Sequence, residues 1–81
     1  MIIKSQDEKR IANFKTCNLI EIMNSAGESK NITVDGMVIG TYSTEKKAIK
    51  VLEMVCRAYE HFRGGNVYEH SIFQMPQDSE V

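Results

Sequence analysis

Apolar and polar residues alternate in short runs through the first half of the chain, a pattern typical of antiparallel strands. Two such runs, at residues 2–5 and 10–14, flank a charged stretch and predict a first hairpin. A third run covers residues 17–23 and ends in small, turn-forming residues. Together with the hairpin that follows, these runs predict a meander of four or five antiparallel strands over residues 1–42.

The clearest turn signal in the chain is the dipeptide Asp35-Gly36, which separates two β-prone apolar runs. This dipeptide favours a two-residue type I′ turn because both residues tolerate a positive φ. The resulting register places four apolar side chains on one face of the hairpin. In that register, Val34 pairs with Met37 and Ile32 pairs with Ile39.

The spacing of apolar residues changes after Tyr42 to that of an amphipathic helix. Ser43 or Thr44 is the expected N-cap, and the glycines after Arg63 mark the end, so we expect a helix over residues 44–63. One stripe of this helix recurs at steps of four and three residues and is expected to face the sheet. The stripe consists of Ala48, Leu52, Val55, Tyr59 and Phe62.

The two periods together predict an α+β fold, namely an antiparallel β-meander with one amphipathic helix packed on one face and a C-terminal strand. The last strand is expected within residues 67–75, and no parallel pair of strands is expected. We expect residues 1–76 to form a single α+β domain and residues 77–81 to form a polar tail without a core role.

The apolar arc of the predicted helix is wider than packing on one sheet requires, which leaves a surplus flank. A segment near the C-terminus adds a second apolar group. We expect these residues to form a protein interface, with a homodimer as the first expectation. The alternative is that the last strand covers the flank within one chain. The candidate interface consists of Val51, Met54, Ala58, Tyr68, Phe73 and Met75.

The chain has 81 residues, and its ten basic and eleven acidic side chains give a formal net charge of −1. This balance lacks the basic excess that most nucleic-acid binders use for non-specific attraction, so nucleic acid is not an expected partner. The sequence has no apolar run near the ~18 to 20 residues of a membrane span. We therefore expect a soluble, cytoplasmic protein that does not bind membranes.

Candidate catalytic and metal-binding side chains are few, because Cys17, Cys56, His61 and His70 are the only cysteines and histidines. Cys56 falls in the apolar arc of the predicted helix and His61 in its polar arc, so the two do not form an activated pair. Cys56 is expected to be a buried thiol. The spacing of the four residues fits no zinc site. We expect no catalytic residues, no metal and no cofactor, and therefore a protein that is not an enzyme.

The polar side of the predicted helix carries a short stripe of cations, Lys46, Lys50 and Arg57. Near a subunit boundary, these side chains form a candidate contact for an anion or a nucleotide. Glu53 lies in the middle of the stripe, and no aromatic or arginine pattern accompanies the lysines. An ordinary solvated helix face is therefore the simpler interpretation.

Three stretches of the sequence resemble a family of small proteins without assigned activity that phages and integrated mobile elements of low-GC Gram-positive bacteria carry. They are the opening MIIKSQD with Asn13-Phe14, the stretch GTYSTEKKAIKVL at residues 40–52, and the close FQMPQDSEV at residues 73–81. The three stretches are spread from one end of the sequence to the other, and the resemblance assigns no catalytic or binding residue. It implies a context in which small proteins often act stoichiometrically, by occluding a host protein or by sequestering a small signal.

Our first hypothesis is a non-enzymatic phage or mobile-element accessory protein that binds an unidentified host or phage protein. One form of this hypothesis is a stoichiometric inhibitor of a host defence system such as a CRISPR effector. The alternatives are an oligomeric protein that sequesters a nucleotide signal and a nucleic-acid accessory protein. A nucleotide that stabilises the folded chain against heat would favour the second hypothesis, and binding that weakens steeply with salt would favour the third.

Overall fold

The computed structural model describes residues 1–61 and 72–81 of the chain. Its strands and helix confirm the predicted α+β class, with an antiparallel meander and one helix packed against it. In chain order the elements are β1 (Ile2–Lys4), β2 (Ile11–Asn13), β3 (Ile20–Asn24), β4 (Lys30–Val34), β5 (Met37–Tyr42), α1 (Glu45–His61), β6 (Ile72–Gln74) and the 3-10 helix η2 (Asp78–Glu80).

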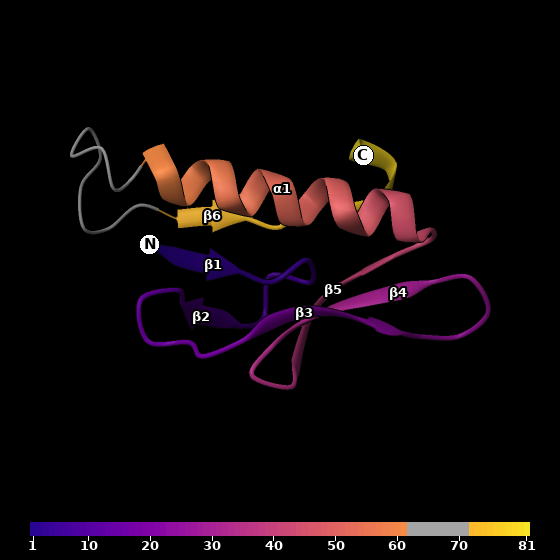
Figure 1. Cartoon of the computed structure of the whole chain (residues 1–81), viewed down its shortest axis with the longest axis horizontal. Helices are drawn as coiled ribbons and strands as arrows, with labels where there is room; N and C mark the ends of the chain where they lie inside the picture. The colour runs from indigo at the N-terminus through magenta and orange to yellow at the C-terminus, as the bar shows by residue number, and fades with distance from the viewer. Residues whose placement is uncertain (62–71) are drawn as a thin grey trace.

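The strands form two three-stranded sheets instead of one continuous meander (Figure 1). Sheet A has the order β2-β1-β6, and sheet B has the order β3-β4-β5. All neighbours are antiparallel except β1 and β6, which run parallel, so the expectation of no parallel pair is wrong. The alternation of side chains in a three-residue strand carries no information about its direction, and tertiary packing therefore decides how β6 enters the sheet.

The turn between β4 and β5 has the predicted geometry, because Asp35 and Gly36 both adopt positive φ angles of 50° and 87°. Val34 pairs with Met37 as predicted. The predicted pairing of Ile32 with Ile39 is wrong, because Ile32 lies opposite Gly40. A β-bulge places the extra residue Ile39 in the ladder, where its side chain is buried.

Gly40 lies where two large side chains come close to the backbone of β5. A Cβ atom at this position would lie 3.0 Å from a ring carbon of Tyr42 and 3.2 Å from the terminal methyl group of Met75. Both of those side chains are fully buried. Any residue larger than glycine would therefore push apart the ring and the methionine, which link β5 to the C-terminal segment.

The helix α1 begins where the sequence predicts, because the Thr44 hydroxyl accepts a hydrogen bond from the Lys47 amide at 3.2 Å. Its buried face differs from the predicted stripe. Ala48, Val51 and Val55 are fully buried, whereas Leu52 is only half-buried. The helix is thus rotated about its axis, so that a residue expected on the surplus flank lies at the centre of the packed face.

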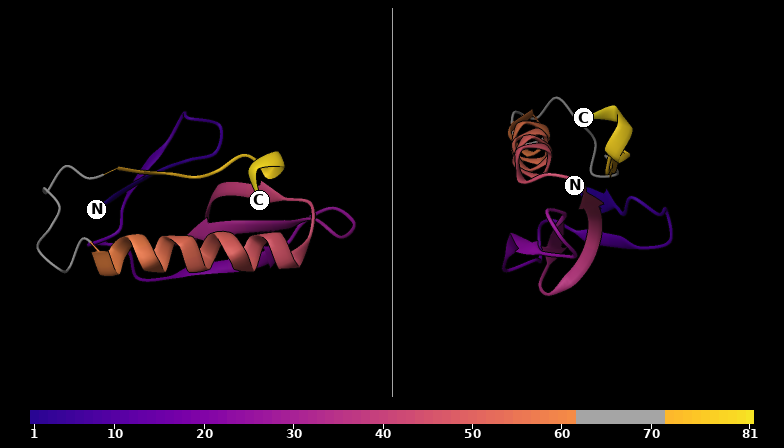
Figure 2. Two further views of the ribbon diagram at one scale, coloured as in Figure 1. Left: turned by 90° about the horizontal axis from the view of Figure 1, so that it is seen from above. Right: turned by 90° about the vertical axis from the view of Figure 1, so that its right-hand side faces the viewer.

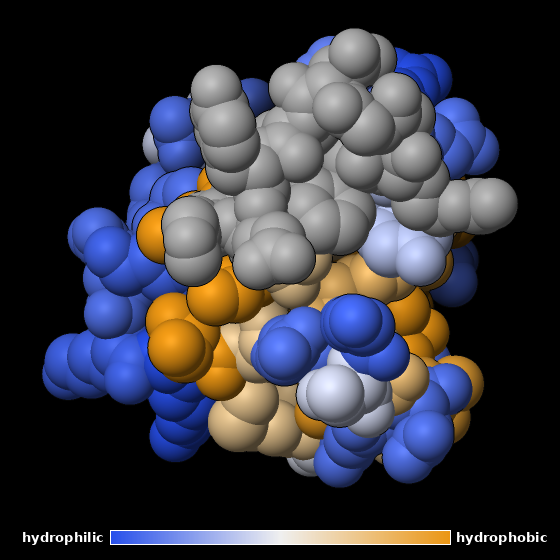
Figure 3. All heavy atoms as spheres, turned by 90° about the vertical axis from the view of Figure 1, so that its left-hand side faces the viewer, coloured by the Kyte–Doolittle hydropathy of each residue, from blue (hydrophilic) through white to orange (hydrophobic). Residues whose placement is uncertain are grey.

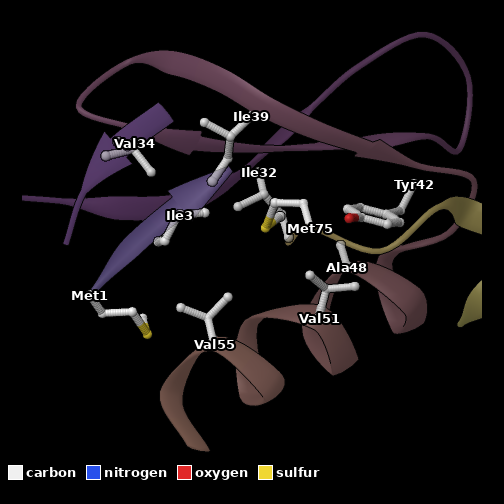
Figure 4. Close-up of a cluster of buried hydrophobic side chains, with 11 residues drawn as sticks. Met1, Ile3, Ile32, Val34, Ile39, Tyr42, Ala48, Val51, Val55 and Met75 are labelled. Atoms are coloured by element: carbon white, nitrogen blue, oxygen red, sulfur yellow. The ribbon is translucent and has the colours of Figure 1, made fainter. Parts of the chain in front are cut away.

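The core lies between α1 and the two sheets (Figure 4). Ile3 of β1 and Met1, which precedes that strand, both contribute to the core. The helix contributes its three buried residues. Phe14 and Tyr59 extend this cluster at the C-terminal end of α1, where their ring centroids are 4.6 Å apart. The buried residues are Met1, Ile3, Ala12, Ile32, Val34, Ile39, Tyr42, Ala48, Val51, Val55 and Met75.

The residues after β6 contribute more than the predicted polar tail. The Tyr42 hydroxyl donates to the carbonyl of Pro76 at 2.8 Å, and the Ser43 amide donates to the Asp78 carboxylate at 2.8 Å. Lys47 Nζ donates to the carbonyl of Asp78 at 3.0 Å. Val81 packs against the core, so the expectation that residues 77–81 have no core role is wrong.

Candidate protein-binding surfaces

The outer face of sheet A carries a row of isoleucines. Successive side chains of a strand point to opposite faces of the sheet. Because Ile3 is fully buried on the inner face of β1, Ile2 and Lys4 lie on the outer face. Ile72 of β6 lies opposite Ile2, and Ile11 of β2 lies opposite Lys4. Ile11 and Ile72 are 66% and 64% exposed, the largest values among the exposed large apolar side chains of the described residues.

These three isoleucines, Ile2, Ile11 and Ile72, are called the isoleucine row from here on. Lys4, Asn13 and Gln74 share the outer face with them, which gives an apolar diagonal with polar margins. Exposed apolar residues of this size on neighbouring strands are typical of contact surfaces. No local pattern in the sequence marks the row, because the pairing of β6 with β1 brings together residues that are seventy positions apart.

The predicted interface does not form one exposed surface. Val51 and Met75 are fully buried in the core, and Met54, Ala58 and Phe73 are half-buried. Ala58 and Phe73 pack against the core cluster. Tyr68 lies outside the described residues. The alternative within one chain is therefore correct for Met75 and Phe73, because the segment that includes β6 packs on the same core as the helix.

The helix does have surplus apolar surface, but on the flank opposite to the predicted one. Ile49 is 46% exposed, Leu52 is half-buried and Cys56 is exposed. These three residues, called the helix flank below, follow one another at steps of three and four residues and so lie in one strip of α1. The prediction that Cys56 is a buried thiol is wrong, because the rotation of the helix turns it toward solvent.

A further apolar surface lies at one end of the molecule. Figure 3 shows this end, with apolar atoms gathered between polar margins. It is the left-hand end in Figure 1, where the N-terminus and the last turn of α1 lie near each other. Half-buried apolar residues that pack against the core there include Phe14 and Tyr59.

The three cations predicted as an anion or nucleotide contact are all exposed on α1. Lys46, Lys50 and Arg57 lie on the solvent side of the helix, and Glu53 lies among them as the sequence indicates. None of the three lines the pocket described next. The geometry of the described residues therefore does not bring these cations together around a cavity.

A shallow pocket of about 170 Å³ lies between the β1–β2 loop and β5. This volume is below the about 300 to 1,000 Å³ that is usual for small-molecule sites. Asp7 and Arg10 contribute its charged groups, but each is engaged locally. The Asp7 carboxylate accepts from the Ser5 hydroxyl at 2.6 Å, and Arg10 Nη1 donates to the carbonyl of Val38 at 3.4 Å. The pocket is lined by Ser5, Gln6, Asp7, Arg10, Val38, Ile39, Gly40 and Thr41.

Three of the described residues, Asp7, Tyr42 and Asp78, have shifted pKa values, and each of them makes a hydrogen bond to another part of the chain. The hydrogen bond from Ser5 and a second from the Lys9 amide hold the pKa of Asp7 below its ordinary value. The pKa of Asp78 is lowered first by the hydrogen bond from the Ser43 amide, with Lys47 adding to the effect. Burial raises the pKa of Tyr42 well above its ordinary value. These groups hold loops and chain ends, and none of them is paired as a nucleophile with a base.

The two cysteines lie in different chemical environments. Cys17 is half-buried and its thiol donates to the carbonyl of Phe14 at 3.3 Å, whereas Cys56 is exposed on α1. Within residues 1–61 and 72–81, no three or more His, Cys, Asp or Glu side chains gather in a group that could hold a metal ion. His70 lies outside these ranges.

In the described part of the chain, no helix has both the length and the apolar character needed to cross a membrane.

A comparison with known proteins identifies no relative of this chain. No family model, no curated protein and no solved structure matches this sequence or its fold.

Proposed function

We propose that this chain is a non-enzymatic accessory protein of a phage or mobile element that acts by binding another protein. The observation that carries the proposal is the isoleucine row on the outer face of sheet A. Two of its side chains are about two-thirds exposed, and they lie on a sheet whose other face is fixed by the core. A rigid apolar surface of this kind is suited to stoichiometric contact with a partner.

In its concrete form, the proposal is that the bound partner is a component of a host defence system, such as a CRISPR effector. The sequence resemblance to small phage and mobile-element proteins supports this context. Lys4 and Asn13 beside the isoleucine row supply polar groups at its margin, as in interfaces with an apolar centre and a polar rim.

The test is an immunity assay in a bacterial strain that carries an active CRISPR system and a plasmid expressing this chain. The wild-type chain should restore phage plating or plasmid transformation by at least tenfold. Ile11→Lys should abolish this effect, because it places a charge in the isoleucine row at its most exposed side chain. Glu53→Gln changes the net charge by the same amount at an exposed helix position and should act like the wild type.

Binding of the purified effector should follow the same order of variants in gel filtration. A wild-type chain that neither protects the phage nor binds the effector would overturn the CRISPR form of the proposal. Equal activity of Ile11→Lys and the wild type would overturn the assignment of the isoleucine row. Stabilisation of the folded chain by a nucleotide, lost in Lys50→Gln, would instead favour sequestration of a nucleotide signal.

A further inference from the structure

The strand β3 lies at an edge of sheet B, and its ladder with β4 determines which backbone groups face outward. The Asp35 amide donates to the carbonyl of Leu19 at 2.8 Å, and the Ser25 amide donates to the carbonyl of Ser29 at 3.0 Å. Hydrogen-bonded residues alternate along an antiparallel pair. Odd-numbered residues of β3 therefore bond to β4, and the N–H and C=O groups of Ile20, Ile22 and Asn24 point to the open edge.

The opposite edge of sheet B is closed by the chain itself. The Gln6 amide donates to the carbonyl of Ile39 at 2.7 Å, and Thr41 exchanges two hydrogen bonds with the Gln6 side chain. Arg10 donates to the carbonyl of Val38. Along β3, by contrast, the outward N–H and C=O groups of Ile20, Ile22 and Asn24 form no hydrogen bond with any described residue.

The side chains of β3 also lack the features that protect edge strands. Natural edges carry lysines, prolines or bulges that prevent pairing with another strand. Here the pairing with β4 is regular over all five residues, and Glu21 is the one charged residue of the strand. Apolar side chains lie on both faces, with Ile20 and Ile22 half-buried on the inner face and Met23 48% exposed on the outer face.

The helix flank lies on the same side of the molecule as this edge. Lys47 bonds to Asp78 of η2, which identifies the side of α1 that faces the C-terminal segment. The helix flank, Ile49, Leu52 and Cys56, lies on the other side of the buried face by helical projection. Figure 2 (right) shows α1 and β3 together on the side of the molecule away from η2. Open backbone groups and exposed apolar side chains therefore occur together.

We propose that a second copy of this chain pairs with β3, edge to edge and antiparallel, about a twofold axis at Ile22. This pairing joins the two copies of sheet B into one six-stranded sheet. Ile22 lies opposite the partner's Ile22, and Ile20 lies opposite the partner's Asn24. All three outward-facing residues of each copy are then hydrogen-bonded, and the two helix flanks face each other across the joined sheet.

The positions of the charged residues favour this register over one that is centred on the preceding residue. Centred on Ile22, the pairing sets Glu21 opposite the partner's Met23, whereas a register centred on Glu21 would oppose two carboxylates directly. The same register brings the β3–β4 loop, which carries Glu28, beside the partner's segment 15–18, which begins with Lys15. Both side chains are exposed, and neither has an ion-pair partner among the described residues. A second copy is thus complementary to the edge in backbone, apolar and charged groups.

Light scattering coupled to gel filtration tests the dimer on the full chain. At about 100 µM the wild type should have twice the 9.2 kDa mass of one chain. Asn24→Pro removes one outward N–H while leaving every bond to β4 in place, and should weaken dimerisation at least tenfold. Ile11→Lys alters another exposed strand residue, on sheet A, and should leave the mass unchanged.

Amide hydrogen exchange on the wild type tests the register without any substitution. The amides of Ile20, Ile22 and Asn24 should exchange slowly at high protein concentration and quickly on dilution, because only the second copy accepts their hydrogen bonds. Any of three results would overturn the proposal: a monomeric mass at about 100 µM, a dimer in which these three amides exchange freely, or an Asn24→Pro variant that is folded and as dimeric as the wild type. None of these measurements depends on the CRISPR assay, so the dimer and the proposed function can fail separately.

Discussion

The side-chain amide of Gln6 bonds to both backbone groups of Thr41, as a residue of a neighbouring strand would. The Thr41 amide donates to Gln6 Oε1 at 2.9 Å, and Gln6 Nε2 donates to the Thr41 carbonyl at 3.0 Å. Gln6 Nε2 also reaches the carbonyl of Pro76 at 3.3 Å. One side chain thus covers part of the outer edge of β5 and links the segment after β1, the strand β5 and the C-terminal segment.

Replacement of Gln6 should therefore destabilise the fold more than its partial exposure indicates. Gln6→Ala removes three hydrogen bonds and leaves the Thr41 groups without their partner, so we expect a loss of about 1 to 3 kcal/mol in the free energy of unfolding. Urea unfolding followed by circular dichroism measures it. Glu53→Ala, at an exposed helix position, should change stability by less than about 0.5 kcal/mol. Equal stability of the two variants would contradict the role assigned to Gln6.

Asp35 should stabilise the β2–β3 connection as well as its own turn. Its carboxylate accepts hydrogen bonds from the amides of Asn18 at 3.0 Å and Leu19 at 2.8 Å. Asp35→Ala loses both and places alanine at a positive φ, so we expect a cost of about 1 to 3 kcal/mol. Asp35→Asn keeps an acceptor and tolerates the same φ, and should cost clearly less. The prediction fails if the two variants unfold at the same denaturant concentration.

Thr33 is a position where a substitution should increase stability. Its side chain is 3% exposed, and its hydroxyl has no hydrogen-bond partner among the described residues. Thr33→Val removes the buried hydroxyl and keeps the β-branched shape, so we expect a gain of about 1 kcal/mol. Thr33→Ser keeps the hydroxyl and loses a buried methyl group, and should be less stable than the wild type. Thermal unfolding of both variants measures the difference, and a destabilised Thr33→Val would mean that the hydroxyl has a partner in solution.

Stability should fall in acid because Asp78 and Asp7 both have pKa values below their ordinary value of 3.8. A carboxyl group whose folded pKa is depressed stabilises the protein above its unfolded pKa, and this contribution is lost as the pH falls through the folded pKa. The loss should therefore begin below about pH 5 and continue past pH 3.8.

Urea unfolding of the wild type and Asp78→Asn between pH 7 and pH 3 checks this dependence. At pH 7 the variant should unfold at lower urea, because the charge that holds Ser43 and Lys47 is gone. In acid the two proteins should converge, since the wild-type carboxyl group is then also uncharged. Parallel curves over the whole range would show that Asp78 does not contribute to the acid sensitivity.

Local sequence features determined much of the secondary structure. The turn at Asp35 and Gly36 and the helix start at Thr44 depend on the φ preferences and side-chain bonds of residues next to each other, and these act in any tertiary context. The change of period after Tyr42 likewise set the boundary between strands and helix. By contrast, no local signal marked the bulge at Ile39. The bulge lies next to Gly40, whose backbone the side chains of Tyr42 and Met75 approach from distant parts of the structure.

The rotation of α1 and the pairing of β6 were decided by the tertiary structure. The sequence gives the helix an apolar arc too wide for one sheet, so several rotations bury comparable apolar area. The contact between Lys47 and Asp78 and the packing of Met75 select the rotation that buries Val51 and exposes Cys56. The direction of β6 brings Ile72 beside Ile2, and the antiparallel ladder with β4 leaves β3 at an edge. The isoleucine row thus depends on the pairing of the distant strands β6 and β1, and the open edge of β3 depends on the separation of β2 and β3 into different sheets. The alternation of residues within a single strand specifies neither.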